Sequence, residues 1–201
     1  MKREGESVQK IWTRDEVQKA LTEILVDALG VKEDKIVPSA SLVHDLGVES
    51  IDFLDIGFRV QQTFGVELPN KTLQDAALRW GNLGELGGIL QHRYGVHVTP
   101  DEIRQFRGMG IPEVLRWVSQ KQGITFQNGE AEKLAEEFVE RLVEEFERVG
   151  FKVSLFDCGE IKKVMLQNLN SPKIVEGMLR LFNVASLVDF ITDRVQSTNS
   201  E

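Results

Sequence analysis

Apolar residues recur at the spacing of a helix face between Thr13 and Gly30. Thr13 and Glu16 have the three-residue separation of a capping box, in which the side chain of each residue accepts a hydrogen bond from the backbone of the other. Gly30 is suited to end the helix, because glycine adopts the left-handed conformation without strain. The pattern therefore predicts a first helix over 13–30. Its apolar positions are Val17, Leu21, Ile24, Leu25 and Ala28.

The next segment, residues 31–49, lacks a regular apolar period. Pro38 and Ser39 interrupt it, so we expect a loop that packs onto neighbouring helices. A second helix is predicted to begin near Ser50 and to end at Gly65, because apolar residues again recur every three or four positions. These residues are Ile51, Leu54 and Phe58 on one side, with Phe53, Val60 and Phe64 nearby.

Residues 70–98 give a mixed signal. Residues 71–80 have a helical pattern, the glycine-rich residues 81–88 are expected to bend, and residues 89–95 are expected to form another helical turn. Residues 151–156 are a candidate strand. The other segments with apolar residues at helical spacing are 99–106, 110–123, 130–150, 159–169, 172–182 and 184–195. We therefore predict an all-α chain.

The composition is that of a folded, acidic protein. Of 201 residues, 41% are hydrophobic, which is sufficient for packed cores in one large or two small domains. Asp and Glu number 32 against 24 Lys and Arg, which gives a net charge of −8. This charge repels nucleic acid and anionic membrane surfaces, so the sequence predicts no nucleic-acid binding and favours basic protein partners.

The single cysteine, Cys158, excludes an internal disulfide framework and a cysteine-rich zinc site. The chain is compatible with a reducing compartment, and we expect a cytoplasmic protein. No apolar run approaches the ~20 residues that a membrane-spanning helix requires. Residues 1–10 lack the apolar core of a secretory signal, so neither export nor a membrane span is predicted.

The strongest candidate for chemistry is Ser50, where the expected loop meets the second helix. A serine at this junction is accessible, and the backbone N–H groups of a helix N-terminus favour an anion such as a phosphodiester. Glu49, Asp52 and Asp55 surround it and suit the positive end of the helix dipole. Taken without its flanking residues, Ser50 is more readily explained as an N-cap with no chemical role.

The remaining polar residues do not indicate a catalytic or metal site. His44, His92 and His97 are too scattered to predict a bound metal ion. Ser50 and His44 lack a third residue that would orient a nucleophile and its base, so hydrolase chemistry is not expected. The many glutamates of residues 130–150 are explained by a solvated helix face.

Three short segments occur in a defined order around the first two predicted helices. A Leu-Gly-Val turn at 29–31 ends the first helix, Asp-Leu-Gly-Val-Glu-Ser-Ile at 45–51 precedes the second, and Phe-Gly-Val-Glu-Leu-Pro at 64–69 follows it. Residues 13–69 thus resemble the acyl carrier protein family, whose middle segment usually reads Asp-Leu-Gly-x-Asp-Ser-Leu. The glutamate and isoleucine that depart from it preserve charge and apolar character.

The resemblance implies a carrier rather than an enzyme. In that family the serine that matches Ser50 accepts 4'-phosphopantetheine from a phosphopantetheinyl transferase that uses coenzyme A, and acyl groups are then held as thioesters on the terminal thiol. The family fold is a four-helix bundle whose apolar interior shelters part of the acyl chain. Its acidic second helix docks on basic patches of partner enzymes. The docking residues implied for this chain are Asp45, Glu49, Ile51, Asp52 and Asp55.

The partners and the pathway are less closely defined. Arg59, Gln61 and Gln62 stand where family members usually carry more acid, which favours a specialised set of partners. The Val-Glu-Ser sequence at 48–50 favours an acyl carrier over a peptidyl carrier, which usually shows Gly-Gly-x-Ser. We expect a carrier in fatty acid or specialised lipid biosynthesis. The alternatives are a polyketide-type carrier and a non-catalytic interaction scaffold that retains the carrier fold.

The resemblance also suggests a division into domains. The third and fourth helices of the family resemble residues 99–106 and 110–120, so the acyl carrier domain is expected at 13–121, with an insertion at about 70–98. A polar, glycine-containing linker precedes a C-terminal helical domain at 129–201. This second domain is a candidate for a degenerate carrier-like unit, because two helices share an apolar spacing. The matching positions are Ile111, Val114 and Trp117 with Val184, Leu187 and Phe190.

Overall fold

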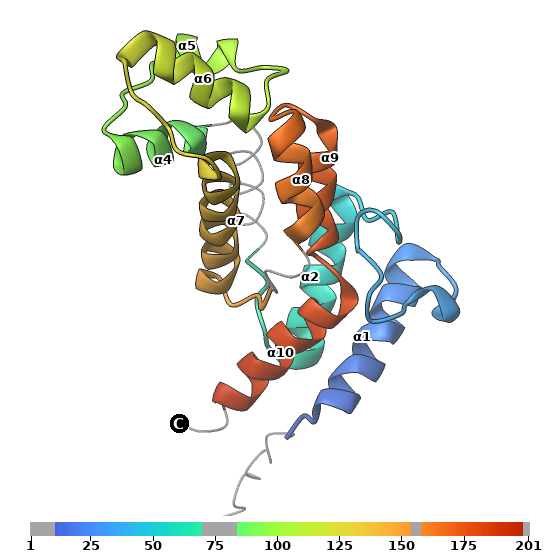
Figure 1. The fold of residues 1–201 in the computed structure, drawn as a ribbon. Helices are drawn as coiled ribbons and strands as arrows, with labels where there is room; N and C mark the ends of the chain where they lie inside the picture. The colour runs from blue at the N-terminus through green and yellow to red at the C-terminus, as the bar shows by residue number, and fades with distance from the viewer. Residues whose placement is uncertain (1–10, 70–83, 154–157, 199–201) are drawn as a thin grey trace, which may run out of the picture.

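The computed structural model describes residues 11–69, 84–153 and 158–198, with Ser50 and Thr198 described by their backbone alone. Within these residues the regular structure is helical, apart from one isolated antiparallel bridge between Ser41 and Asn183 (Figure 1). The helices are α1 (Arg14–Leu29), the 3-10 helix η1 (Glu33–Lys35), α2 (Ser50–Phe64), α4 (Gly84–Tyr94), α5 (Pro100–Gln105), α6 (Ile111–Gln122), α7 (Glu130–Arg148), α8 (Gly159–Gln167), α9 (Pro172–Arg180) and α10 (Val184–Thr198). The predicted all-α class is confirmed.

Local signals define the helix ends where they were expected. In α1 the Glu16 N–H donates to Thr13 Oγ1 at 3.3 Å, and the Thr13 N–H donates to Glu16 Oε2 at 2.9 Å. Gly30 ends the helix with a φ of +64°, and Gly65 ends α2 with a φ of +71°. These positions need glycine because other residues are strained at positive φ.

The structure also bears on two less regular segments, the glycine-rich stretch at 81–88 and the candidate strand at 151–156. Residues 84–88 begin α4 instead of bending, which corrects the prediction for this glycine-rich stretch. A Cβ atom on Gly87 would lie 3.0 Å from Ile103 Cδ1, so the missing side chain allows α4 to pack closely on α5. Residues 151–153 contain no strand. Residues 154–156, and the helix expected at 71–80, lie outside the described residues.

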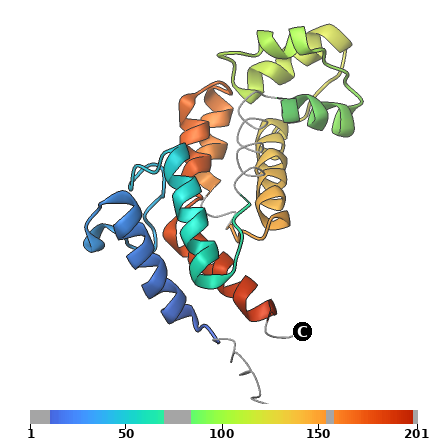
Figure 2. The ribbon, with the colours of Figure 1, turned by 180° about the vertical axis from the view of Figure 1, so that it is seen from behind.

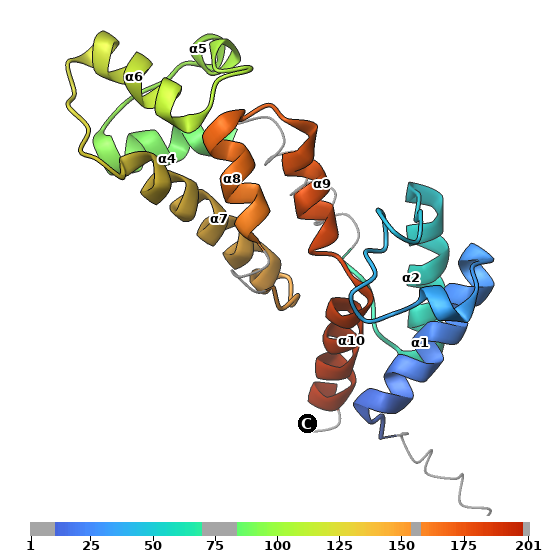
Figure 3. The ribbon, with the colours of Figure 1, turned by 45° about the vertical axis from the view of Figure 1, so that its right-hand side comes forward.

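The described helices form two groups (Figure 3). α1 packs against α2 and α10, and we call these three helices together with residues 31–49 lobe 1. α7 packs against α4, α6 and α8, and α8 packs against α9; helices α4 to α9 form lobe 2. Lobe 2 therefore lies between α2 and α10 in the sequence. In space, α5 and α6 lie at the end of the molecule opposite the start of α1 (Figures 1 and 2).

Backbone hydrogen bonds connect the loop of lobe 1 to the start of α10. The Leu42 N–H donates to the Phe182 carbonyl at 2.9 Å, and the Val184 N–H donates to the Ala40 carbonyl at 3.0 Å. The Ser41 hydroxyl donates to the Leu179 carbonyl at 3.1 Å, at the end of α9. The loop that leads to Ser50 is therefore attached to the C-terminal part of the chain.

The expected division into a carrier domain at 13–121 and a C-terminal domain at 129–201 stays a prediction. Residues 99–106 and 110–120 do form α5 and α6, but α6 packs on α7 and α8, whereas α10 packs on α1. The physical reason is that α6 and α10 carry the same spacing of apolar residues, so the local pattern cannot distinguish their partners. The independent folding of either part remains a prediction. The matching apolar positions are buried in both helices at Ile111, Val114, Val184, Leu187 and Phe190.

Candidate functional site

Ser50 is the first residue of α2. The preceding Glu49 holds the N-cap position in an extended conformation, with φ −98° and ψ 170°. The Glu49 N–H donates to Asp52 Oδ2 at 2.8 Å, which satisfies one backbone donor at the start of the helix. Ser50 is thus the first residue inside the helix. The N-cap residue is Glu49, whereas the sequence pattern alone favoured Ser50 at that position.

The loop before Ser50 is closed by the side chain of Asp45. Its Oδ2 accepts from the Ser41 N–H at 2.8 Å, and its Oδ1 lies 2.8 Å from Nδ1 of His44. The hydrogen bond with His44, followed by that from Ser41, lowers the pKa of the Asp45 carboxyl below its ordinary value. Leu42 and Leu46 bury their side chains in the core from the same loop. Asp45 therefore determines the shape of the loop, whatever further contact it makes with a partner.

His44 connects this loop to α9 in lobe 2. Its Nε2 lies 3.1 Å from Oε1 of Glu176 and 3.1 Å from Nη2 of Arg180. Because a carboxylate only accepts, Nδ1 carries the proton that is shared with Asp45. Nε2 then accepts from the guanidinium of Arg180, whose Nη2 also donates to Glu176 Oε1 at 2.9 Å. No sequence pattern predicts this contact, because Glu176 and Arg180 are more than 130 residues away from His44.

One face of α2 exposes large apolar side chains to solvent. Ile51 is 68% exposed, Leu54 59% and Phe58 58%. Their spacing places them on one side of the helix, and we call them the α2 apolar stripe. The opposite side buries Ile56 and Val60 against the core. The periodicity of the sequence showed that an apolar face exists at these positions, but it did not show that this face points to solvent.

The predicted docking acids have different surroundings. Glu49 is exposed at the end of α2. Asp55 pairs with Nε of Arg59 at 2.8 Å, and Arg59 Nη1 also lies 3.8 Å from Asp27 Oδ2. Arg59, the basic residue that departs from the family pattern, is therefore paired with two carboxylates of lobe 1. Asp52 caps α2, as described above, and is partly buried.

Among the described residues, no group of three or more His, Cys, Asp or Glu side chains is arranged to hold a metal ion. His92 and His97 are exposed, in α4 and just after it. Within the same described ranges, no helix is long and apolar enough to cross a membrane.

Residues 19–79 match a family model described as the phosphopantetheine attachment site. The match covers less than a third of the chain and includes most of α1, the loop and all of α2, whereas α4 to α10 lie outside it. No solved structure matched the chain. The match is to a domain of the kind found in the acyl carrier protein family, and domains of that kind are non-catalytic carriers. Such a domain is the attachment site for covalent 4'-phosphopantetheine.

The surroundings of Ser50 fit this group. Ser50 lies between two exposed residues, Glu49 and Ile51, so the backbone on both sides is at the molecular surface. The first turn of a helix also provides a favourable field for the negative charge of a phosphodiester. When bound, the group supplies a thiol at the end of a flexible arm, where an acyl group is held as a thioester.

Proposed function

We propose that this chain is an acyl carrier protein and that Ser50 carries its 4'-phosphopantetheine. The observation that supports this assignment best is the position of Ser50. It follows the loop closed by Asp45, starts α2 and lies inside the residues that match the attachment-site model. A serine hydroxyl displaces 3',5'-ADP from coenzyme A in this reaction, and the transferase supplies the catalytic groups.

The α2 apolar stripe and the exposed Glu49 support a docking face for the transferase and for acyl-transferring enzymes. Monomeric proteins seldom expose several large apolar residues side by side unless a partner covers them. Ile51, Leu54 and Phe58 lie on the helix that starts at Ser50, so a partner bound there has access to the prosthetic group. We propose that partners present an apolar patch bordered by basic side chains, because steering by opposite charge speeds association.

We place this activity in fatty acid or specialised lipid biosynthesis in the cytoplasm. The buried, single Cys158 supports a reducing compartment. A polyketide-type carrier is an alternative that uses the same residues. An interaction scaffold is favoured by a separate observation, namely that lobe 2 lies outside the matched residues although it contains most of the α-helices that the structure describes.

Intact mass spectrometry after incubation with a phosphopantetheinyl transferase and coenzyme A tests the assignment. The full chain is expected to gain one phosphopantetheinyl group, and Ser50→Ala is expected to gain none. Ser39→Ala is the matched control, since Ser39 is an exposed loop residue outside the α2 motif. A Ser50→Ala variant that is still modified would place the attachment elsewhere. A wild-type chain that stays unmodified with several transferases would favour the scaffold.

A further inference from the structure

Ser41 is a buried polar residue within the loop that leads to Ser50. Its exposed fraction is 1%, although serine is usually found at the surface. The hydroxyl donates to the Leu179 carbonyl of α9 at 3.1 Å and accepts from the His44 N–H at 3.1 Å. The Ser41 N–H donates to Asp45 Oδ2 at 2.8 Å. One buried side chain thus connects the loop to lobe 2.

The Ser41 carbonyl closes the turn that follows. It accepts from the Leu46 N–H at 3.1 Å. Gly47 then has a φ of +71°, a conformation in which other residues are strained. The side chains on either side of this glycine, Leu46 and Val48, are both buried. The path of the backbone up to Val48, two residues before Ser50, is therefore defined by bonds that begin at Ser41.

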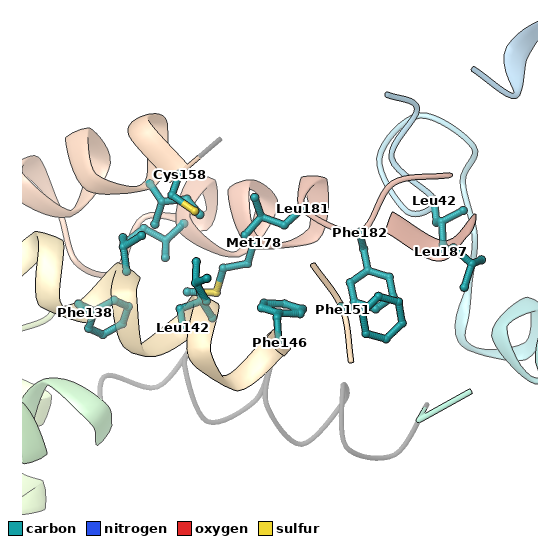
Figure 4. Packing of buried hydrophobic residues seen from close by; sticks show 14 of the residues in the cluster. Leu42, Phe138, Leu142, Phe146, Phe151, Cys158, Met178, Leu181, Phe182 and Leu187 are labelled. Atoms are coloured by element: carbon teal, nitrogen blue, oxygen red, sulfur yellow. The ribbon is translucent and has the colours of Figure 1, made fainter. Parts of the chain in front are cut away.

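A second set of bonds reaches Val48 from the segment between α9 and α10. The Phe182 carbonyl accepts from the Leu42 N–H at 2.9 Å, and the Leu42 carbonyl accepts from the Val48 N–H at 2.9 Å. The Leu42 side chain is buried beside Leu187 of α10 (Figure 4). Leu42 therefore links the chain after α9 to a residue two positions before Ser50.

At the surface of the same loop, Arg180 of α9 adds a charged contact. Its Nη2 lies 3.1 Å from His44 Nε2 and donates to Glu176 Oε1 at 2.9 Å. His44 Nδ1 in turn lies 2.8 Å from Asp45 Oδ1. These side chains are partly exposed, so solvent screens each contact and its contribution to stability is small. We therefore expect Arg180 to hold the loop less firmly than the buried Ser41.

Transfer of phosphopantetheine depends on where the transferase finds the serine hydroxyl. The serine oxygen bonds to the phosphorus that bears the pantetheine arm, 3',5'-ADP leaves with the electrons of the broken P–O bond, and the hydroxyl proton passes to a base of the transferase. A misplacement of about 1 Å in such a step can cost about 10²-fold in rate, even when its cause is distant. The α2 apolar stripe begins after Ser50, whereas the loop defines the residues before it. The stripe therefore affects binding of the transferase, and the loop affects the orientation of Ser50.

We infer that Ser41 is a positioning residue for the transfer of phosphopantetheine to Ser50, and that it acts by holding the loop on α9 of lobe 2. Arg180 contributes to the same attachment from the surface. The inference rests on the proposed attachment at Ser50. It gives lobe 2, whose helices lie outside the matched residues, a part in presenting the serine to the transferase.

The test measures kcat and KM for modification of the full chain by a phosphopantetheinyl transferase. Ser41→Ala is expected to lower kcat about tenfold with an unchanged KM, because the docking stripe is intact while Ser50 is less well placed. Thr192→Val is the matched control, since Thr192 is also buried but its hydroxyl donates within its own helix, to the Val188 carbonyl at 2.7 Å. A variant that is merely destabilised has less folded substrate, which raises the apparent KM and leaves kcat unchanged.

Arg180→Ala is a surface change that provides the test if Ser41→Ala does not fold. It should lower kcat by less than about fivefold, again without a change in KM. Arg141→Ala is its control and should leave kcat unchanged, because Arg141 forms the same kind of ion pair with Glu137 of its own helix α7. An unchanged kcat in Ser41→Ala, or a loss that appears only as a higher KM, would overturn the inference. An equal loss of kcat in Thr192→Val would do so as well.

Amide hydrogen exchange separates the failure of this inference from the failure of the proposed function. In unmodified Ser41→Ala the Leu46 and Val48 N–H groups should exchange faster than in the wild type, although their backbone acceptors are retained, whereas the Val60 N–H in α2 should not. Unchanged exchange at Leu46 and Val48 would mean that the loop stays in place without the hydroxyl, whatever the transferase does. Faster exchange in a chain that gains no mass with a transferase would contradict the attachment at Ser50 itself.

Discussion

Helices α2 and α7 are both amphipathic, but they differ in how much of their apolar surface is buried. In α7 the apolar stripe, which includes Leu134, Phe138 and Leu142, is buried against the neighbouring helices of lobe 2. In α2 only part of the apolar surface is buried, and Leu54 and Phe58 are more than half exposed. The stability of the fold accounts for the stripe of α7. It does not account for the stripe of α2, which is therefore better explained by a partner.

The two lobes also differ in their relation to the attachment-site model. The match to the attachment-site model includes most of α1, the loop and all of α2 in lobe 1, whereas every helix of lobe 2 lies outside it. Nevertheless the loop before Ser50 is bonded to Phe182 and contacts Glu176 through His44, both outside the matched residues. The comparison teaches that a functional segment which is recognisable by its sequence can depend for its structure on residues that are not.

The largest effect is expected when α10 is removed. A fragment of residues 1–124 keeps α1 and α2 but loses the helix that packs on α1, including the ion pair of Arg14 Nε with Asp189 Oδ1 at 2.8 Å. We therefore expect an aggregated or molten fragment, whereas a carrier domain that ends at residue 121 would fold without α10. Circular dichroism during urea unfolding measures the difference, with residues 1–198 as the control. A cooperatively folded fragment that is modified at Ser50 would restore the division expected from the sequence.

The next effect compares one phenylalanine from each helix. Phe138→Ala in α7 should lower the free energy of unfolding by about 3–5 kcal/mol, because it leaves a cavity in a full core. Phe58→Ala in α2 should change it by less than about 0.5 kcal/mol, since this side chain is already exposed. Urea denaturation of the two variants measures both values. Similar losses in the two variants would mean that Phe58 contributes to the core.

In a modification assay the larger effect is expected from Phe58→Ala and the smaller one from Phe138→Ala. Phe58→Ala is expected to slow transfer of phosphopantetheine to Ser50 several-fold, because an apolar contact with the transferase is lost. Phe138→Ala, assayed where it is folded, should be modified at the wild-type rate. Equal rates for Phe58→Ala and the wild type would show that the transferase does not use the α2 apolar stripe.

A smaller effect is expected from the loop in lobe 1. Asp45→Asn should lower stability by about 1 kcal/mol at pH 7, because it weakens the bonds to the Ser41 N–H and to His44. The pKa of Asp45 is lowered from 3.8 in the folded chain, so its contribution is complete above pH 3.8 and is lost as the pH falls through the lower value. The difference in stability between the variant and the wild type should therefore shrink in acid. A constant difference from pH 7 to pH 3 would contradict this origin.

The smallest effect lies in lobe 2. The Tyr94 hydroxyl donates to Glu130 Oε2 at 2.7 Å, and burial followed by this bond raises the pKa of Tyr94 from 10.0 to about 12. The stabilisation is complete below pH 10 and is lost as the pH rises from 10 to 12. Tyr94→Phe should cost about 0.5 kcal/mol at neutral pH, and this cost should disappear in alkali. Spectrophotometric titration of the chain's single tyrosine provides an independent measure of the pKa.

The sequence by itself was sufficient to predict where several helices begin and end, and to indicate a phosphopantetheine-attachment segment. The capping box of Thr13 and Glu16, and glycines such as Gly65, act within a few residues of their own position, so their effect can be predicted without knowledge of the fold. The segment from Asp45 to Ile51 is also local, and its resemblance to the acyl carrier protein family agrees with the family match at 19–79.

Only the tertiary structure decided which helices complete lobe 1 and which faces are exposed. The apolar residues of α6 and α10 have the same spacing, and α10 is placed beside α1 by bonds such as that from Val184 N–H to the Ala40 carbonyl. The exposure of Phe58 and the burial of Phe151 likewise depend on neighbours that are distant in sequence. Periodicity records that a residue is apolar, whereas its burial depends on what the rest of the chain places against it.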